Sequence, residues 1–125
     1  MGKAEAVVID SGSDSRIVEI VFRGGDWKDD KEIRGVIQKA AAETDADALL
    51  LNLSTFRYRG GDYASGFLVA FFDADKRAKR PACFVGADAG LRPLFNTLDP
   101  TGVFAIRFFE DRSEAVTYLR SRLDR

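Results

Sequence analysis

The sequence predicts an α/β fold built on a mixed, mostly parallel five-stranded sheet. Strand-like and helix-like segments alternate along most of the chain, which is typical of a parallel sheet with helical crossovers. Residues 48–53 form a nearly continuous apolar run, as expected of a central strand that is covered on both faces. Two strand-like segments follow one another at the start, which favours an antiparallel pair at one edge.

The first two strands are predicted over residues 6–9 and 16–23, with the turn-rich residues 10–14 between them. This arrangement favours a hairpin, although a loop of five residues also permits other strand pairings. Alternation divides the second strand into two faces, with Val18, Ile20 and Phe22 on one and Ile17, Glu19 and Val21 on the other.

A helix is predicted over residues 27–43, where the apolar residues recur at helical spacing. They are Ile33, Val36, Ile37, Ala40 and Ala41. Asp26 or Asp29 is the predicted N-cap, and the acidic residues of the first turn suit the positive end of the helix dipole.

A second helix is predicted over residues 63–78, after the apolar strand. Its buried face consists of Ala64, Phe67, Leu68 and Phe71. Phe72 flanks that face, and Val69 is expected to point away from it. The stretch 67–72 is apolar nearly all round, so either a neighbouring helix or a partner protein covers its extra side.

The remaining elements complete the order ββαβαβαβα in one domain, 1–125, with about four helices. A strand is predicted over 82–86, a helix from Asp88 to about Leu98, and a last strand over 103–109. Asp111 is the predicted N-cap of a final helix.

The composition excludes several classes of function. The chain has 125 residues with 19 basic and 20 acidic side chains, so it lacks the basic excess of a nucleic-acid binder. It has no histidine and a single cysteine, Cys83, which excludes histidine-based triads, Cys/His dyads and nearly every zinc site. The longest apolar run is too short to span a bilayer, and the N-terminus lacks the apolar core of a signal peptide. We therefore expect a cytoplasmic protein without membrane insertion, metal or cofactor.

Few residues are candidates for catalysis or for binding a phosphate group. Gly60 and Gly61 precede a helix near Arg57 and Arg59, but Asp62 places a carboxylate where a phosphate would have to bind. The carboxylate pairs lack a companion nucleophile, and Cys83 lies among apolar neighbours, where cysteines are inert. These observations favour a protein that is not an enzyme.

Several stretches, in this order and spacing, resemble the STAS domain (sulfate transporter and anti-sigma factor antagonist). They are the strand 49–53 with its lead-in 54–58, the segment 84–95, the Gly102 turn before a strand, and the ending 111–119. The likeness covers almost the whole chain and implies a STAS-like fold.

The signature of that family is a loop at the start of the second helix whose serine or threonine is phosphorylated by a partner kinase. The match places this loop on residues 60–63 and the phospho-acceptor on Asp62, so the chain resembles a divergent member without the acceptor hydroxyl. Ser54 and Ser65 are the nearest hydroxyl side chains. Aspartate supplies a fixed charge of about −1, where phosphoserine carries about −1.5 to −2. Asp62 is either a substitute for phosphoserine or only a helix cap.

The resemblance implies a non-catalytic interaction module of bacterial signalling or transcription regulation. Its partner would be an anti-sigma factor or a kinase-like protein, and a homodimer is left open. The alternative is a STAS-like domain that binds a small anion, a nucleotide or a lipid-transport ligand. The predicted partner-binding loop and helix comprise Arg57, Arg59, Gly60, Gly61, Asp62, Tyr63, Ser65, Val69 and Phe72.

Overall fold

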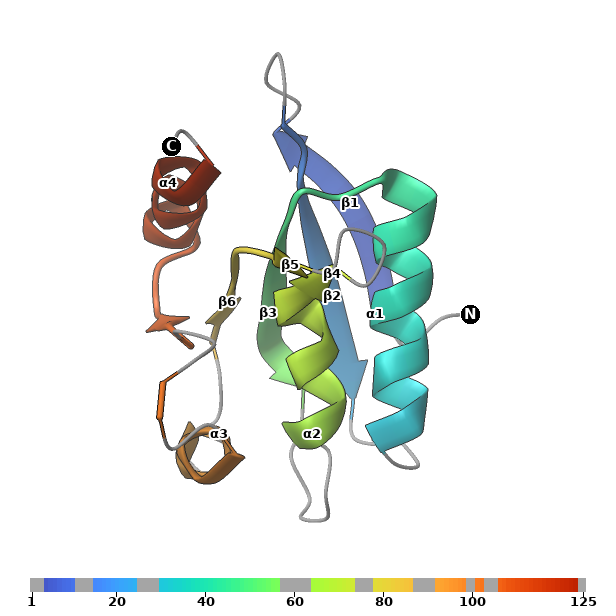
Figure 1. Cartoon of the computed structure of the whole chain (residues 1–125), viewed down its shortest axis with the longest axis vertical. Coiled ribbons are helices and arrows are strands. Elements are labelled where there is room, and N and C mark those ends of the chain that lie inside the picture. Colours follow the sequence, from blue (N-terminus) through green and yellow to red (C-terminus); the bar gives the residue numbers. More distant parts are fainter. Residues whose placement is uncertain are drawn as a thin grey trace.

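A five-stranded sheet organises the molecule (Figure 1). The computed structural model describes residues 4–10, 15–24, 30–56, 64–73, 78–86, 92–98, 101–102 and 106–123. In spatial order the strands are β1 (Ala4–Asp10), β2 (Ile17–Gly24), β3 (Ala48–Phe56), β6 (Ala82–Val85) and β7 (Phe108–Phe109). β1 is antiparallel to β2, and the other neighbours are parallel. The predicted α/β class, the edge hairpin and the mixed sheet are confirmed.

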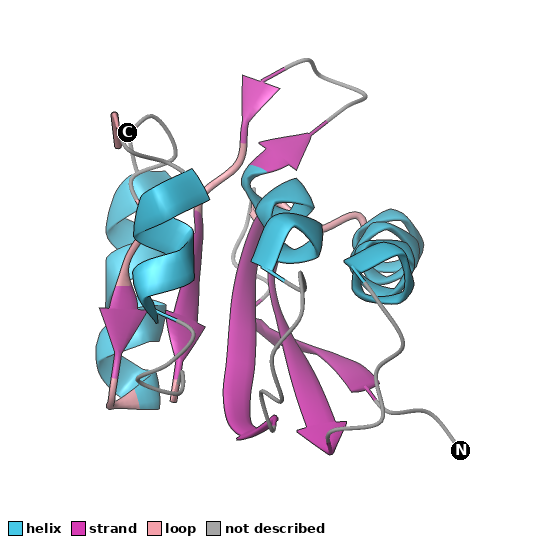
Figure 2. Cartoon of the chain, turned by 90° about the horizontal axis from the view of Figure 1, so that it is seen from below, coloured by secondary structure: helices cyan, strands magenta, loops and turns pink. Residues whose placement is uncertain are grey.

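Helices cover both faces of this sheet. They are α1 (Asp30–Thr44), α2 (Ala64–Phe67) with its 3₁₀ continuation η1 (Leu68–Phe71), α3 (Arg92–Leu98) and α4 (Arg112–Leu123). α1, α2 and α3 pack on one face, and α4 packs on the other. Figure 2 shows α1 and α2 together on one side of the long strands.

The strand order explains this distribution. From β2 onward, each parallel strand lies beside its predecessor in the same direction across the sheet. Right-handed crossovers that advance in one direction place all their helices on one face. Consequently the described sheet has no position at which the strand order reverses, which is where doubly wound proteins bind ligands.

Two cores confirm the alternation predicted for the central strands. Val18, Ile20 and Phe22 pack beneath α1 and α2, whereas Ile17 packs on the face covered by α4. β3 contributes to both cores, as expected of a strand buried on both sides. In α1, Ile33, Ile37 and Ala40 of the predicted stripe are buried, and Val36 and Ala41 are half-buried against the same core.

The helix predicted over 63–78 is confirmed in its first half, but its predicted end is wrong. The helical segment ends at Phe71, and the chain continues as a small antiparallel hairpin of β4 (Phe72–Asp73) and β5 (Ala78–Lys79). Arg80 caps the end of the helical segment. Its guanidinium donates hydrogen bonds to the carbonyl oxygens of Ala70 at 2.9 Å and of Val69 and Phe72 at 3.2 Å. These bonds satisfy carbonyl groups that a longer helix would pair with its own next turn.

The ends of the other helices and strands agree in part with the prediction. Asp111 caps α4, because its Oδ1 accepts a hydrogen bond from the backbone N–H of Ser113 at 2.9 Å. β7 is shorter than the predicted strand 103–109, of which residues 103–105 lie outside the described part. The proposed caps Asp26 and Asp29, and Asp88 at the expected start of α3, also lie outside it.

Candidate functional site

The structure describes only part of the predicted partner-binding loop and helix. Arg57, Arg59, Gly60, Gly61, Asp62 and Tyr63 lie outside the described residues. Ser65 belongs to α2, whose first residue follows Asp62 by two positions. What the structure describes of the predicted site is therefore the helical segment and the hairpin after it.

Val69 does not point away from the core, as the helical wheel of a regular α-helix had indicated. It is half-buried and packs against the core beneath α1 and α2. The segment changes from α-helix to the tighter 3₁₀ geometry at Leu68, which rotates the following side chains relative to an α-helix. Of the two alternatives for the apolar stretch, a neighbouring helix accounts for most of it, because α1 packs along both α2 and η1.

Phe72 is the exception within this stretch. Its side chain is 43% exposed, whereas Phe71 beside it is buried. The backbone of Phe72 is extended, and its carbonyl oxygen accepts one of the Arg80 hydrogen bonds. The Phe72 ring therefore projects from a β-hairpin whose backbone is held by the hydrogen bond from Arg80.

Phe72 follows the helical segment formed by α2 and η1. The eight residues of α2 and η1 separate Phe72 from residue 63. Eight helical residues span about 12–16 Å. Phe72 is therefore separated from the start of α2 by the length of this helical segment.

Ser54, a hydroxyl near the loop, lies against the end of β6. It is exposed, and its backbone N–H donates to the Asn52 side chain at 3.0 Å. Gly86 approaches it so closely that a Cβ at that glycine would lie 2.5 Å from Ser54 Oγ and 2.9 Å from Ser54 Cα. Gly86 also has a φ of +74°, so a glycine is required there on both counts.

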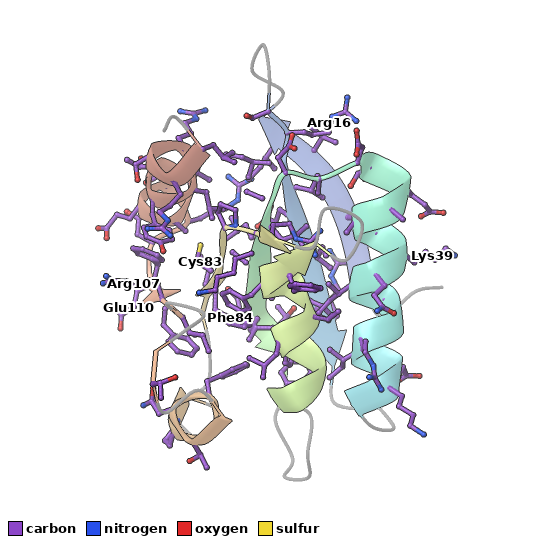
Figure 3. The ribbon with its side chains drawn as sticks, viewed as in Figure 1. Arg16, Lys39, Cys83, Phe84, Arg107 and Glu110 are labelled. Carbon is purple, nitrogen blue, oxygen red and sulfur yellow. The ribbon has the colours of Figure 1, made fainter. Side chains whose placement is uncertain are left out.

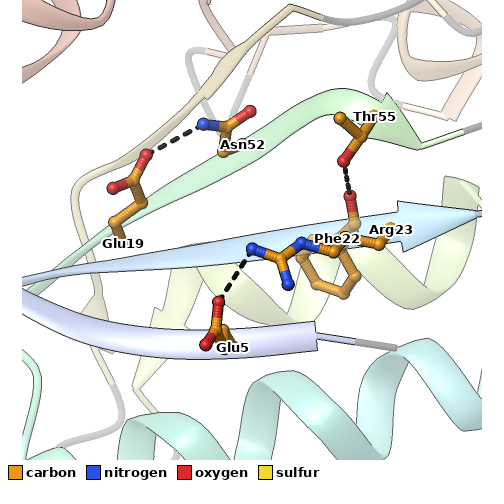
Figure 4. A network of polar contacts seen from close by, with 6 residues as sticks. All are labelled: Glu5, Glu19, Phe22, Arg23, Asn52 and Thr55. Carbon is orange, nitrogen blue, oxygen red and sulfur yellow. Dashed lines mark hydrogen bonds and ion pairs between the residues drawn. The ribbon is translucent and has the colours of Figure 1, made fainter. Parts of the chain in front are cut away.

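A buried carboxylate on the opposite face was missed by the sequence analysis. Glu19 of β2 is 6% exposed and accepts a hydrogen bond from Asn52 Nδ2 at 2.9 Å (Figure 4). Arg112, at the start of α4, donates from Nε to both carboxylate oxygens at 3.1 Å and from Nη2 to Oε1 at 3.0 Å. The hydrogen bond to Glu19, and then its charge, raise the pKa of Arg112 above the ordinary value.

This pairing joins two residues that are 93 positions apart in the chain. The only sequence signal was a charged residue in the middle of the otherwise apolar run 17–22. Arg112 is partly exposed, and both carboxylate oxygens of Glu19 have a hydrogen-bond donor. The network is therefore explained as a structural link between β2, β3 and α4. It needs no ligand to satisfy Glu19.

Cys83 lies in β6 between the sheet and α4 (Figure 3). It is fully buried, and its sulfur is 3.9 Å from the carbonyl oxygen of Ala115. Burial raises the pKa of the thiol to about 12. The thiolate, which is the nucleophile of cysteine chemistry, is therefore disfavoured.

We expect the native protein to resist thiol reagents. With a pKa of about 12, only on the order of one thiol in ten thousand is ionised at pH 8, and the sulfur is shielded as well. A disulfide exchange reagent should therefore react with Cys83 only at the rate of unfolding, and rapidly in denaturant. Rapid reaction in native buffer would contradict the burial of Cys83.

The fold and the described site define an α/β protein with one mixed sheet and an exposed aromatic residue beside a capped 3₁₀ helix. The chain matches no known protein-family model and no curated protein. Within the described residues, no three histidine, cysteine, aspartate or glutamate side chains gather closely enough to hold a metal ion. No described helix is both long and apolar enough to cross a bilayer.

Proposed function

We propose that this chain is a non-catalytic protein-interaction module of bacterial signalling or transcription regulation, similar in role to anti-sigma factor antagonists. Its partner is an anti-sigma factor or a kinase-like protein. The partner surface runs from the loop 57–63 along the helical segment to Phe72. Asp62 supplies a fixed negative charge at the position where the resembled family carries its phospho-acceptor.

The exposure of Phe72 is the observation that carries this proposal. Aromatic side chains are enriched in the centres of protein interfaces, where they bury a large area at low entropic cost. Phe72 is 43% exposed on a backbone that Arg80 holds, so little ordering is needed when a partner covers it. The sequence resemblance places the partner surface on the same segment.

The small-ligand alternative has weaker support. Ligands of open α/β sheets bind at the carboxyl ends of strands where the strand order reverses. In the described sheet the order β2-β3-β6-β7 advances in one direction throughout. We therefore keep a single proposed function.

Binding can be measured by calorimetry against the anti-sigma kinase encoded nearest to this gene. We expect Phe72→Ser to weaken the complex by at least about tenfold, as for an aromatic anchor at an interface. Arg59→Glu tests the loop end of the same surface. Thr117→Ala, an exposed position of α4 on the other face, is the control and should bind as the wild type does.

A phosphorylation assay tests the role of Asp62. Incubation with the same kinase and ATP should leave the wild type unmodified, whereas the Asp62→Ser variant should take up phosphate at position 62, which mass spectrometry would locate. Phosphate on Ser54 or Ser65 of the wild type would show that the switch lies elsewhere. Unchanged binding of both Phe72→Ser and Arg59→Glu would place the partner surface elsewhere.

A further inference from the structure

The outer edge of β1 is an open β-strand. β1 forms the end of the five-stranded sheet and pairs with β2 alone among the described strands. Its sequence, residues 4–10, contains neither lysine nor proline, the residues that commonly protect such edges. A β-bulge between Val8 and Asp10 interrupts the regular pairing only at its far end. The backbone of residues 4–8 is therefore suited to accept another strand.

A groove runs beside this edge, between β1 and α1. It has a volume of about 240 Å³. Its apolar lining includes Ala4 and Ala6 of β1, and Val36 and Ala40 of α1. The two alanines leave space that larger side chains would fill, so the groove can take an apolar side chain of moderate size.

The same strand carries apolar side chains that nothing described covers. Val7 is 51% exposed and Val8 is 41% exposed. Val8 pairs with Val18 and Ala6 pairs with Ile20, so both lie on the sheet face that α1 covers. Val7 pairs with Glu19 and lies on the opposite face. The same strand thus borders the groove at Ala6 and carries, two residues later, the exposed side chain of Val8, which can fill such a groove.

We propose that β1 pairs with β1 of a second copy of this chain, as an antiparallel extension of the sheet about a twofold axis. With the two Val7 residues opposite each other, Ala6 of each copy lies opposite Val8 of the other. Each Val8 then enters the groove beside Ala4 and Ala6 of its partner. Each copy therefore supplies one groove and one Val8 that fills the groove of the other copy, as a twofold interface requires.

The charges along this edge favour a second copy over a charged peptide. In this register the residues that pair across the twofold axis, 6–8, carry no charge, so no like charges face each other. Glu5 also forms an ion pair with Arg23 at 2.8 Å (Figure 4). The rim of the groove on α1 has one side chain of each sign, Lys39 and Glu43, and Figure 3 shows Lys39 on the outer side of α1.

The expected dimer is weak, because one strand edge and one groove bury less surface than a standard stable interface. Sedimentation equilibrium over about 10–500 μM should show a reversible monomer–dimer equilibrium in the wild type. Val8→Lys should weaken association by at least about tenfold, because it places a charge in the groove and protects the edge. Phe72→Lys is the matched control, since Phe72 is an apolar side chain of similar exposure, and it should leave the dimer unchanged.

A cross-linking experiment tests the register. Opposed residues of antiparallel strands have Cα atoms about 4.5–5.5 Å apart, within the range of a disulfide. Oxidised Val7→Cys should therefore form a covalent dimer much faster than oxidised Phe72→Cys, and the buried Cys83 should not compete.

A wild type that stays monomeric over the whole range would overturn the proposal. So would a Val8→Lys variant that is folded by circular dichroism and associates like the wild type. If Val8→Lys does not fold, Val8→Thr, which keeps the β-branched shape but places a hydroxyl in the groove, is measured in its place and should also weaken association. The proposal is independent of the proposed function, because Phe72→Ser tests one surface and Val8→Lys tests the other.

Discussion

Replacing Phe84 by alanine is expected to lower the free energy of unfolding by about 3–5 kcal/mol, the typical cost of truncating a buried phenylalanine. Phe84 is fully buried at the centre of the aromatic cluster between the sheet and the helices. The rings around it are Phe95 at 4.7 Å, Phe108 at 5.2 Å, and Phe67 and Phe71 at 5.8 Å between ring centroids. Because these rings come from four different elements, the cavity cannot collapse by moving one side chain.

Urea denaturation of the wild type and the variant measures this loss, provided that the slope of the transition stays unchanged. Phe72→Ala removes the same atoms from an exposed position and should cost well under half as much. Phe84→Leu retains most of the volume and serves if the alanine variant does not fold. Equal losses at positions 84 and 72 would contradict the described core.

Removal of the Arg112 side chain is expected to have the second largest effect. Arg112→Ala leaves the carboxylate of Glu19 buried, with only the hydrogen bond from Asn52. Breaking a fully buried ion pair typically costs about 3–5 kcal/mol. About half of the Arg112 side chain is exposed, so water screens the pair and we expect a loss of about 1–2 kcal/mol at pH 7.

The pH dependence identifies the cause of that loss. An unpaired buried carboxylate is costly only while it is ionised, so the difference in unfolding free energy between wild type and Arg112→Ala should become smaller in acidic solution. In the Arg112→Ala background, adding Glu19→Gln should remove this pH dependence. Arg122→Ala, an exposed position of the same helix, should change stability by less than about 0.5 kcal/mol. A loss that is independent of pH would mean that Arg112 acts through packing alone.

Much of the fold follows from short-range patterns. The two faces of β2, the apolar stripe of α1 and the cap at Asp111 each depend on residues within one element, and each is confirmed. The side-chain periods of strands and helices are properties of the backbone, so a few residues are enough to reveal them. The doubly covered β3 is confirmed for the same reason, because burial on both faces removes polar residues from the whole strand.

The end of the second helix could not be read from such patterns. The local propensity of residues 72–78 is compatible with a longer regular α-helix. The assumption of such a helix also led to the wrong orientation for Val69. Arg80, from a later segment, caps the end of the helix, because its guanidinium donates hydrogen bonds to the carbonyl oxygens of Ala70 and Val69. The exposure of Phe72 follows from that ending.

The amino-acid order alone established the α/β class, the edge hairpin and the strand faces, since these depend on local periodicity. Only the folded chain decided that Glu19 meets Arg112, that the helical segment ends at Phe71, and that an open groove lies beside Ala4 and Ala6 at the sheet edge. Each of these depends on side chains brought together from distant parts of the chain, and such contacts have no repeating signature along the sequence.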